Sequence, residues 1–239
     1  MTTYDDRLRE HLTQDSSGRG NARGPVVFVN RLLPPSMRMP VRVLATRAIS
    51  PVSRRRLGDR VDRLRGDGAP VLLHLGCGTE RKPVFVNLDL LGARFDVAFD
   101  LTRGIQLPDG TVDGIFHEHV LEHLPLRVGF LFLQECRRVL RPGGVLRVAV
   151  PDAGACLDSY AGKASPDWAD SAPVPLMAVE RLFYDHQHMA MYDSQKLESM
   201  MRVAGFRDVS TCEFGETRLP VAPDSPDRRS GTLYVEGAR

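Results

Sequence analysis

The chain has 239 residues, of which 42% are apolar and 26% charged, and its formal net charge is +2. This length suits one large domain with a small appendage, and the near-zero charge excludes a global attraction to nucleic acid or to an anionic membrane. The charge is uneven, because residues 1–70 carry 14 Arg against 7 acidic residues. The four cysteines form no CxxC pair, which argues against a zinc knuckle or a disulfide framework and suits a reducing compartment.

The N-terminal third is predicted to be an appendage. Residues 1–24 are polar and have no apolar period, which predicts a flexible tail. Residues 25–66 predict a basic helical segment, in which a helix with Ser53 as its N-cap has one apolar face: Leu57, Val61 and Leu64. The acidic start of the chain and the lack of any long apolar window predict a cytoplasmic protein with no signal peptide and no transmembrane segment.

Residues 67–239 predict a single α/β domain. Short apolar runs separated by turns predict seven strands: Val71–Leu75, Val84–Leu88, Phe95–Phe99, Val112–Phe116, Val145–Val150, Val209–Phe214 and Leu233–Val235. One helix is expected after Pro125, ending at the stop signal 141–144, and another from Asp193 to Gly205. Strands that alternate with helices predict a mainly parallel sheet whose ligands bind at the carboxyl ends of the strands. Residues 152–192 are too long for a bare loop and predict a lid-like insertion that covers a substrate.

A glycine turn and two carboxylates form the sharpest motif. The apolar run VLLHL leads directly into Gly76, Cys77 and Gly78, and glycines there allow a sharp turn and close approach of a ligand. A GxG alone also fits a plain tight turn. Asp89 ends the second strand and suits ribose hydroxyls, while Asp100 ends the third and suits an adenine amino group. Together these residues predict a nucleoside ligand.

Position 81, where a dinucleotide site would have its third glycine, holds Arg81, which disfavours NAD. S-adenosylmethionine (SAM) carries an amino-acid tail in place of a pyrophosphate. The chain resembles a class I SAM-dependent methyltransferase in the strings LHLGCGT, VNLDL, DVAFDL, LPDGTVDGIFHEHVLEHL, ECRRVLRPGGVLRVAVPD, AGFRDV and TLYVEG. The resemblance covers about residues 70–158 densely and 186–237 loosely. It implies a doubly wound, mainly parallel seven-stranded sheet with helices on both faces.

The resemblance also implies SAM as the cofactor, S-adenosylhomocysteine as its product, and a set of cofactor contacts. These are Gly76, Cys77 and Gly78 at the methionyl part, Asp89 and Leu90 at the ribose, Asp100 and Leu101 at the adenine, and His117 beneath the sulfonium. The chain departs from the family between the first two strands. Only eight residues, from Gly76 to Pro83, join them, so the first helix is expected to be cut to about one turn.

Two histidine motifs supply the candidate bases. The segment HEHVLEH contains His119 and lacks the Asn/Asp-Pro-Pro-aromatic cluster that holds a planar amino group, which favours methylation of a hydroxyl by a base. The segment YDHQHM offers His186 and His188, as bases, as a metal pair with Asp185, or as a structural latch. Residues 119–123 also spell HxxEH, a zinc-peptidase pattern, which remains a remote alternative.

The favoured function is O-methylation of a sugar, a glycan or a small natural product. The alternative is a methyltransferase-like module that binds SAM or a protein partner without turnover. No metal ligand is assigned and metal dependence is left open. Nucleic acid is disfavoured as a partner because the half of the chain with the motifs is acidic, and a homodimer is compatible with the sequence.

Overall fold

The computed structural model describes residues 35–91, 94–163, 174–184 and 187–239. The predicted tail 1–24 lies outside these ranges. The described helices are α3 (Pro35–Ala48), α4 (Ser50–Gly66), α5 (Leu126–Val139), α6 (Ala153–Tyr160), α7 (Pro175–Tyr184) and α8 (Ser194–Val203). The strands are β1 (Leu72–Leu75), β2 (Val86–Asp89), β3 (Val97–Ala98), β4 (Val112–Glu118), β5 (Leu140–Pro151), β6 (Arg207–Cys212) and β7 (Thr232–Ala238).

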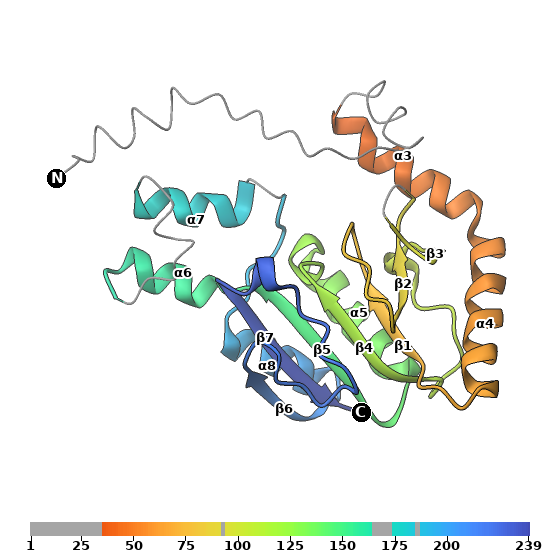
Figure 1. Cartoon of the computed structure of the whole chain (residues 1–239). Coiled ribbons are helices and arrows are strands. Elements are labelled where there is room, and N and C mark those ends of the chain that lie inside the picture. The colour runs from red at the N-terminus through yellow and green to blue at the C-terminus, as the bar shows by residue number, and fades with distance from the viewer. Residues whose placement is uncertain (1–34, 92–93, 164–173, 185–186) are drawn as a thin grey trace.

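All seven strands form one sheet in the order β3-β2-β1-β4-β5-β7-β6 (Figure 1). The strands from β1 to β5 pair in parallel, and β7 is antiparallel to both β5 and β6. The predicted seven-stranded, mainly parallel sheet is therefore confirmed. Because the chain reverses its direction of strand addition at β1 and β4, the carboxyl ends of these two strands form the crevice in which such sheets bind ligands.

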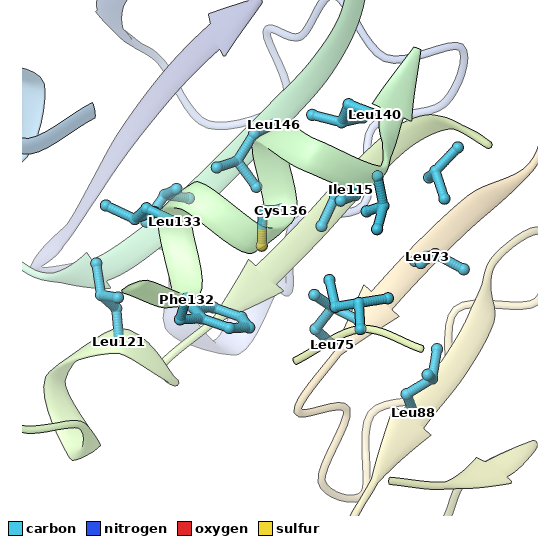
Figure 2. Close-up of a cluster of buried hydrophobic side chains, with 14 of the residues drawn as sticks. Leu73, Leu75, Leu88, Ile115, Leu121, Phe132, Leu133, Cys136, Leu140 and Leu146 are labelled. Carbon is cyan, nitrogen blue, oxygen red and sulfur yellow. The ribbon is translucent and has the colours of Figure 1, made fainter. Parts of the chain in front are cut away.

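The main core lies on one face of the sheet. Leu73 and Leu75 of β1 point to this face by the two-residue period of a strand, and they share a buried cluster with residues of α4, α5 and α8. Figure 2 shows α5 contributing Phe132, Leu133 and Cys136 to this cluster. The helix is thereby fixed against β4 and β5, and the turn that precedes it is held at the carboxyl end of β4.

The opposite face is closed by the segment between β6 and β7. Leu219 packs against Leu72 and Phe116 there. The fully buried Arg147 of β5 donates to Asp224 at 2.6 and 2.7 Å and to Glu236 at 3.0 Å. Desolvation raises the pKa of Glu236, but hydrogen bonds from its neighbours outweigh it and the pKa is lowered. The buried guanidinium therefore ties this segment to β5 and β7.

Residues 76–85, which connect β1 to β2, form turns and no helix. The first helix is therefore absent here, whereas the sequence predicted one helical turn. The two strands nevertheless pair in parallel. The fully buried Asn87 replaces the missing helix, because its side chain accepts from Lys82 N at 2.9 Å and donates to Phe85 O at 2.9 Å. It also contacts the ring of His74 at 3.1 Å and donates to Asp96 at 2.9 Å.

The basic helical segment is confirmed within the described residues, but its boundary was predicted wrongly. Ser53 is a buried residue inside α4, and the N-cap position belongs to Ile49. Pro51 lies in the first helical turn, where its missing N–H costs nothing, so the helix begins earlier than expected. Leu57 and Val61 are buried as predicted.

Two further boundaries differ from the sequence expectation. β4 continues to Glu118, so His117 is a strand residue and does not follow the strand. β5 begins at Leu140, which pairs with Val112, and the register shifts across the stop signal 141–144 before Val145 pairs with Gly114. In the insertion 152–192, α6 and α7 share a small apolar cluster. Across the residues that the structure describes, every helix is too short or too polar to cross a bilayer.

Removing the Asn87 side chain is expected to destabilise the domain. The substitution Asn87→Ala leaves the buried groups of Lys82, Phe85 and His74 without a partner, and we expect the free energy of unfolding to fall by about 3 kcal/mol. Urea denaturation followed by circular dichroism measures the change. Gln134→Ala, which removes an exposed amide on α5, is the control, and an equal effect of the two substitutions would refute the role given to Asn87.

Candidate functional site

The glycine turn after β1 is held by the end of β2. Gly76 and Gly78 have φ of +68° and +53°, a region that glycine enters without steric cost. Leu88 O accepts from Gly76 N at 2.8 Å, and the Asp89 carboxylate accepts from Gly78 N at 2.7 Å. A Cβ on Gly78 would meet nothing within 4 Å, so the space above the turn is open. A Cβ on Gly76 would clash with Val120 Cγ2, so the segment that carries Val120 passes directly over the turn.

Asp89 lies where the resemblance requires a ribose acid. One carboxylate oxygen accepts from Gly78 N, and the other accepts from Leu90 N at 2.6 Å. The side chain keeps 15% of its surface exposed. Burial raises the pKa of Asp89, partly offset by these backbone donors and by Arg42. Each oxygen retains a lone pair, so the carboxylate can accept further hydroxyl groups.

Asp100 follows β3 and caps the short 3₁₀ turn of residues 101–103. One carboxylate oxygen accepts from the Thr102 hydroxyl at 2.6 Å, and the other accepts from Arg47 Nε at 2.7 Å. Desolvation raises the pKa of Asp100, but the hydrogen bonds from Thr102 and Arg47 outweigh it and the pKa lies below its usual value. Asp100 is therefore ionised at neutral pH.

Helix α3 contacts both carboxylates. Arg42 lies 3.7 Å from Asp89 and donates to Leu91 O at 2.6 Å, while Thr46 Oγ1 accepts from Leu91 N at 2.9 Å. Arg47 completes the contact at Asp100. In Figure 1 this helix lies at the end of β2. The sequence showed the excess of arginine but gave no signal that pairs these two arginines with residues more than 45 positions away.

The other predicted cofactor contacts are more buried. Cys77 Sγ donates to Arg94 O at 3.3 Å, and burial raises the pKa of its thiol to about 12. His117 is fully buried beside Phe132, both its ring nitrogens lack a hydrogen-bond partner within the described part of the chain, and burial lowers its pKa to about 3. Leu101 is partly buried in the 3₁₀ turn. Contact of these residues with a cofactor stays a prediction.

The two histidine motifs meet in space. Glu122 O accepts from Met189 N at 2.7 Å and from Ala190 N at 3.1 Å, which holds the YDHQHM segment against the turn of residues 121–123. The Glu122 carboxylate lies 3.4 Å from His119 Nδ1 and 3.9 Å from His188 Nε2. His119 also lies 3.2 Å from Thr232 Oγ1 and has a left-handed backbone with φ of +53°, a conformation that non-glycine residues adopt chiefly where the surroundings enforce it.

The HxxEH pattern does not form the geometry that a zinc peptidase needs. Residues 121–123 are a 3₁₀ turn that follows β4 closely, so His119 and His123 do not share one face of an α-helix. The peptidase alternative is therefore wrong. The physical reason is that pairing of His119 N with Ala149 O extends the sheet to this residue.

The insertion 152–192 contains the remaining candidates, and it begins with the carboxylate of Asp152. Asp185 and His186 fall outside the described residues. Asp152 caps α6 by accepting from Ala155 N at 3.0 Å. Next to this cap, an open groove of about 400 Å³ is lined by Leu157, Phe183, Met189 and Lys196, among others. This groove shares Ala190 and Tyr192 with the surroundings of Glu122 and His188.

The two sequence comparisons each match about a quarter of the chain. Residues 93–148 match a family model described as a methyltransferase domain. A protein of Mycolicibacterium smegmatis described as a probable S-adenosylmethionine-dependent methyltransferase is 41% identical over 59 residues, which are 25% of this chain and 22% of that protein. The chain thus spans about a fifth of the length of the curated relative that it matches.

Solved structures resemble the chain more distantly. A SAM-dependent methyltransferase from Archaeoglobus fulgidus superposes with a TM-score of 0.46 at 16% identity, over 75% of this chain and 92% of that chain. Phosphoethanolamine N-methyltransferase 2 of Haemonchus contortus, in complex with SAM, gives a TM-score of 0.47 at 10% identity, over 71% and 48%. These similarities carry neither an activity nor an acceptor over to this chain.

The contact between Arg47 and Asp100 generates a prediction. An adenine amino group that donates to Asp100 must share the oxygen that Arg47 occupies, and an ion pair with a half-exposed arginine contributes little, about 0.2–1 kcal/mol. We therefore expect Arg47→Ala to strengthen binding of S-adenosylhomocysteine by about two- to five-fold in calorimetry. Arg54→Ala, on the exposed surface of α4, is the matched control. Weaker binding by Arg47→Ala would show that the arginine positions the carboxylate and does not compete for it.

Proposed function

We infer that this chain, which carries a class I SAM-dependent methyltransferase domain, transfers the methyl group of SAM to a hydroxyl of a small molecule or saccharide. The observation that carries the proposal is the open glycine turn at the carboxyl edge of a mainly parallel sheet, with carboxylates at the ends of the next two strands. The match of residues 93–148 to a methyltransferase domain supports the same class. The acceptor class is proposed on the histidine chemistry described below.

The residues at this edge fit an adenosyl donor. Asp89 retains exposed oxygen surface for ribose hydroxyls, Asp100 is an ionised acceptor for an amino group, and the space above Gly78 is not filled by the chain. The connection to β2 has no helix. The three successive amides of the glycine turn already donate to Leu88 O and Asp89, so the carboxylate of the methionyl part needs other donors. When bound, SAM supplies an electrophilic methyl group on a sulfonium that leaves as neutral S-adenosylhomocysteine.

Among the described histidines, His119 is the one we assign as the base. Its side chain is 25% exposed, whereas that of His188 is 5% exposed. Glu122 faces Nδ1 of His119, which orients the ring and leaves Nε2 to face Thr232 and an incoming hydroxyl. His119 would take the acceptor proton as the oxygen forms its bond to the methyl carbon. Alignment and exclusion of water supply the rest of the rate enhancement.

The groove beside α6 and α7 suits the acceptor. Its lining combines apolar side chains such as Phe183 and Leu157 with the polar Lys196 and Asp193. This mixture suits sugars, phenols and similar natural products, which present both a ring face and hydroxyl groups. A sugar or glycan is our first choice.

A module that binds without turnover is the second candidate. The observation that favours it is the pairing of Arg42 and Arg47 with Asp89 and Asp100, since α3 then satisfies the carboxylates that a donor would use. Formation of S-adenosylhomocysteine with a panel of monosaccharides and phenols separates the candidates. SAM binding with no product from any acceptor in the panel would favour the module.

The ribose assignment predicts a selective loss of cofactor affinity. Asp89→Ala removes the acceptor of two ribose hydroxyls, and we expect SAM to bind about 30-fold or more weakly, which corresponds to about 2 kcal/mol. Calorimetry measures the dissociation constant. Asp109→Asn, which removes an exposed carboxylate just before the amino end of β4, is the control. Unchanged affinity in a folded Asp89→Ala protein would contradict the assignment.

The assignment of His119 as the base predicts a loss of turnover with little change in SAM affinity. His119→Gln keeps a polar side chain but cannot take a proton, so turnover with the best acceptor of the panel should fall by about 100-fold or more. SAM affinity should stay within about two-fold, because His119 faces Glu122 and Thr232. It does not face Asp89 or Asp100, the carboxylates proposed to bind the cofactor. A normal rate in this variant would transfer the role of base to another group.

A further inference from the structure

The main-chain contacts of Glu122 place three metal-ligating side chains together. The turn of residues 121–123 carries Glu122 and His123, and the hydrogen bonds from Met189 and Ala190 to Glu122 O place His188 beside them. One ligating atom from each of Glu122, His123 and His188 lies within 4.8 Å of the others. The rings of His123 and His188 meet edge to face with centroids 4.8 Å apart. Segments 65 residues apart in the sequence thus build one cluster.

The Glu122 carboxylate is the second observation that points to a ligand. Its side chain is 2% exposed, and neither oxygen has a hydrogen-bond partner among the residues that the structure describes. A buried carboxylate is costly unless donors or a cation satisfy it. The nearby Arg228 contacts Glu118 at 4.0 Å and not Glu122, so no arginine or lysine in the described ranges forms an ion pair with this carboxylate.

We propose that Glu122, His123 and His188 bind a divalent first-row transition metal ion such as Zn²⁺, Mn²⁺ or Co²⁺. Two imidazoles with one carboxylate suit these ions better than Mg²⁺ or Ca²⁺, which prefer ligand sets made of oxygen. Metal–ligand bonds of about 2.0–2.2 Å place ligand atoms roughly 3–4 Å apart. The three donor atoms, which lie within 4.8 Å of one another, therefore need to close by about 1–2 Å to hold the ion. His119 Nδ1 lies 3.4 Å from the same Glu122 oxygen that His188 approaches, and it helps to orient the carboxylate.

The position of the site suggests what its open coordination positions bind. Val120, two residues before Glu122, lies directly over Gly76 of the glycine turn. The ion would therefore lie next to the methionyl part of a bound donor, and three protein ligands leave positions free for hydroxyl oxygens of an acceptor. This role rests on the proposed function, whereas binding of the metal does not.

Metal binding to the full-length protein tests the inference without an activity measurement. We expect wild-type protein to bind one equivalent of Co²⁺ with visible ligand-field absorption, and Zn²⁺ to displace it. Glu122→Gln and His188→Asn should each weaken Co²⁺ binding by about 100-fold or more, because each removes one of only three ligands. Glu118→Gln is the matched control, since Glu118 is a buried carboxylate on the same segment that accepts from Ser225 N at 3.1 Å.

The outcomes separate this inference from the proposed function. Wild-type protein that binds neither Co²⁺ nor Zn²⁺, or folded Glu122→Gln and His188→Asn proteins that bind Co²⁺ like wild type, would overturn the metal site even if SAM binds. Metal binding that both substitutions abolish, in a protein with no affinity for SAM, would support the site and refute the methyltransferase. If Glu122→Gln or His188→Asn fails to fold, His123→Gln decides, because His123 is exposed.

Discussion

The bond between the glycine turn and the end of β2 is the constraint on which the site depends. Leu88 O and the Asp89 carboxylate accept three successive amides of the turn, so the first two strands are joined without a helix. A parallel crossover normally needs a dozen or more residues, and here Asn87 satisfies the backbone that a helix would otherwise satisfy. The same bonds that make the crossover short also fix Gly78 beside Asp89, so the geometry of the ligand turn and the register of the sheet are inseparable.

Omitting the first helix changes the electrostatics of this edge. A helix N-terminus there would offer partial positive charge to an anionic ligand group, and the chain has none between β1 and β2 in its described residues. The positive charge comes from α3, whose Arg42 and Arg47 reach the two strand-end carboxylates from outside the sheet. The basic segment, which looks like a separate appendage in the sequence, is therefore part of the same edge. Arg42 and Arg47 balance the negative charges of Asp89 and Asp100.

The sequence predicted what local periodicity encodes. All seven strands, the end of α5 at its Pro-Gly-Gly signal and the N-cap of α8 at Asp193 follow from apolar period and capping residues, and they were confirmed. Ser53 was predicted wrongly as an N-cap, because a proline in the first turn starts the helix earlier and no local rule ranks the two signals. The meeting of Glu122 with His188 was not predictable in this way. It depends on main-chain hydrogen bonds from Met189 and Ala190 to Glu122 O. These segments are far apart in the sequence, and no local pattern indicates that they meet.

This last pairing gives the two histidine motifs a common explanation. Taken singly, HEHVLEH resembles a peptidase helix and YDHQHM a loop with a latch, and neither accounts for a buried glutamate with no donor. Taken together, they place the rings of His119 and His188 near the same oxygen of that glutamate, on the segment where Val120 lies over the glycine turn. A carboxylate kept there is costly for folding, so its retention needs a compensating partner. The cation that we propose between the glutamate and the histidines would supply that partner.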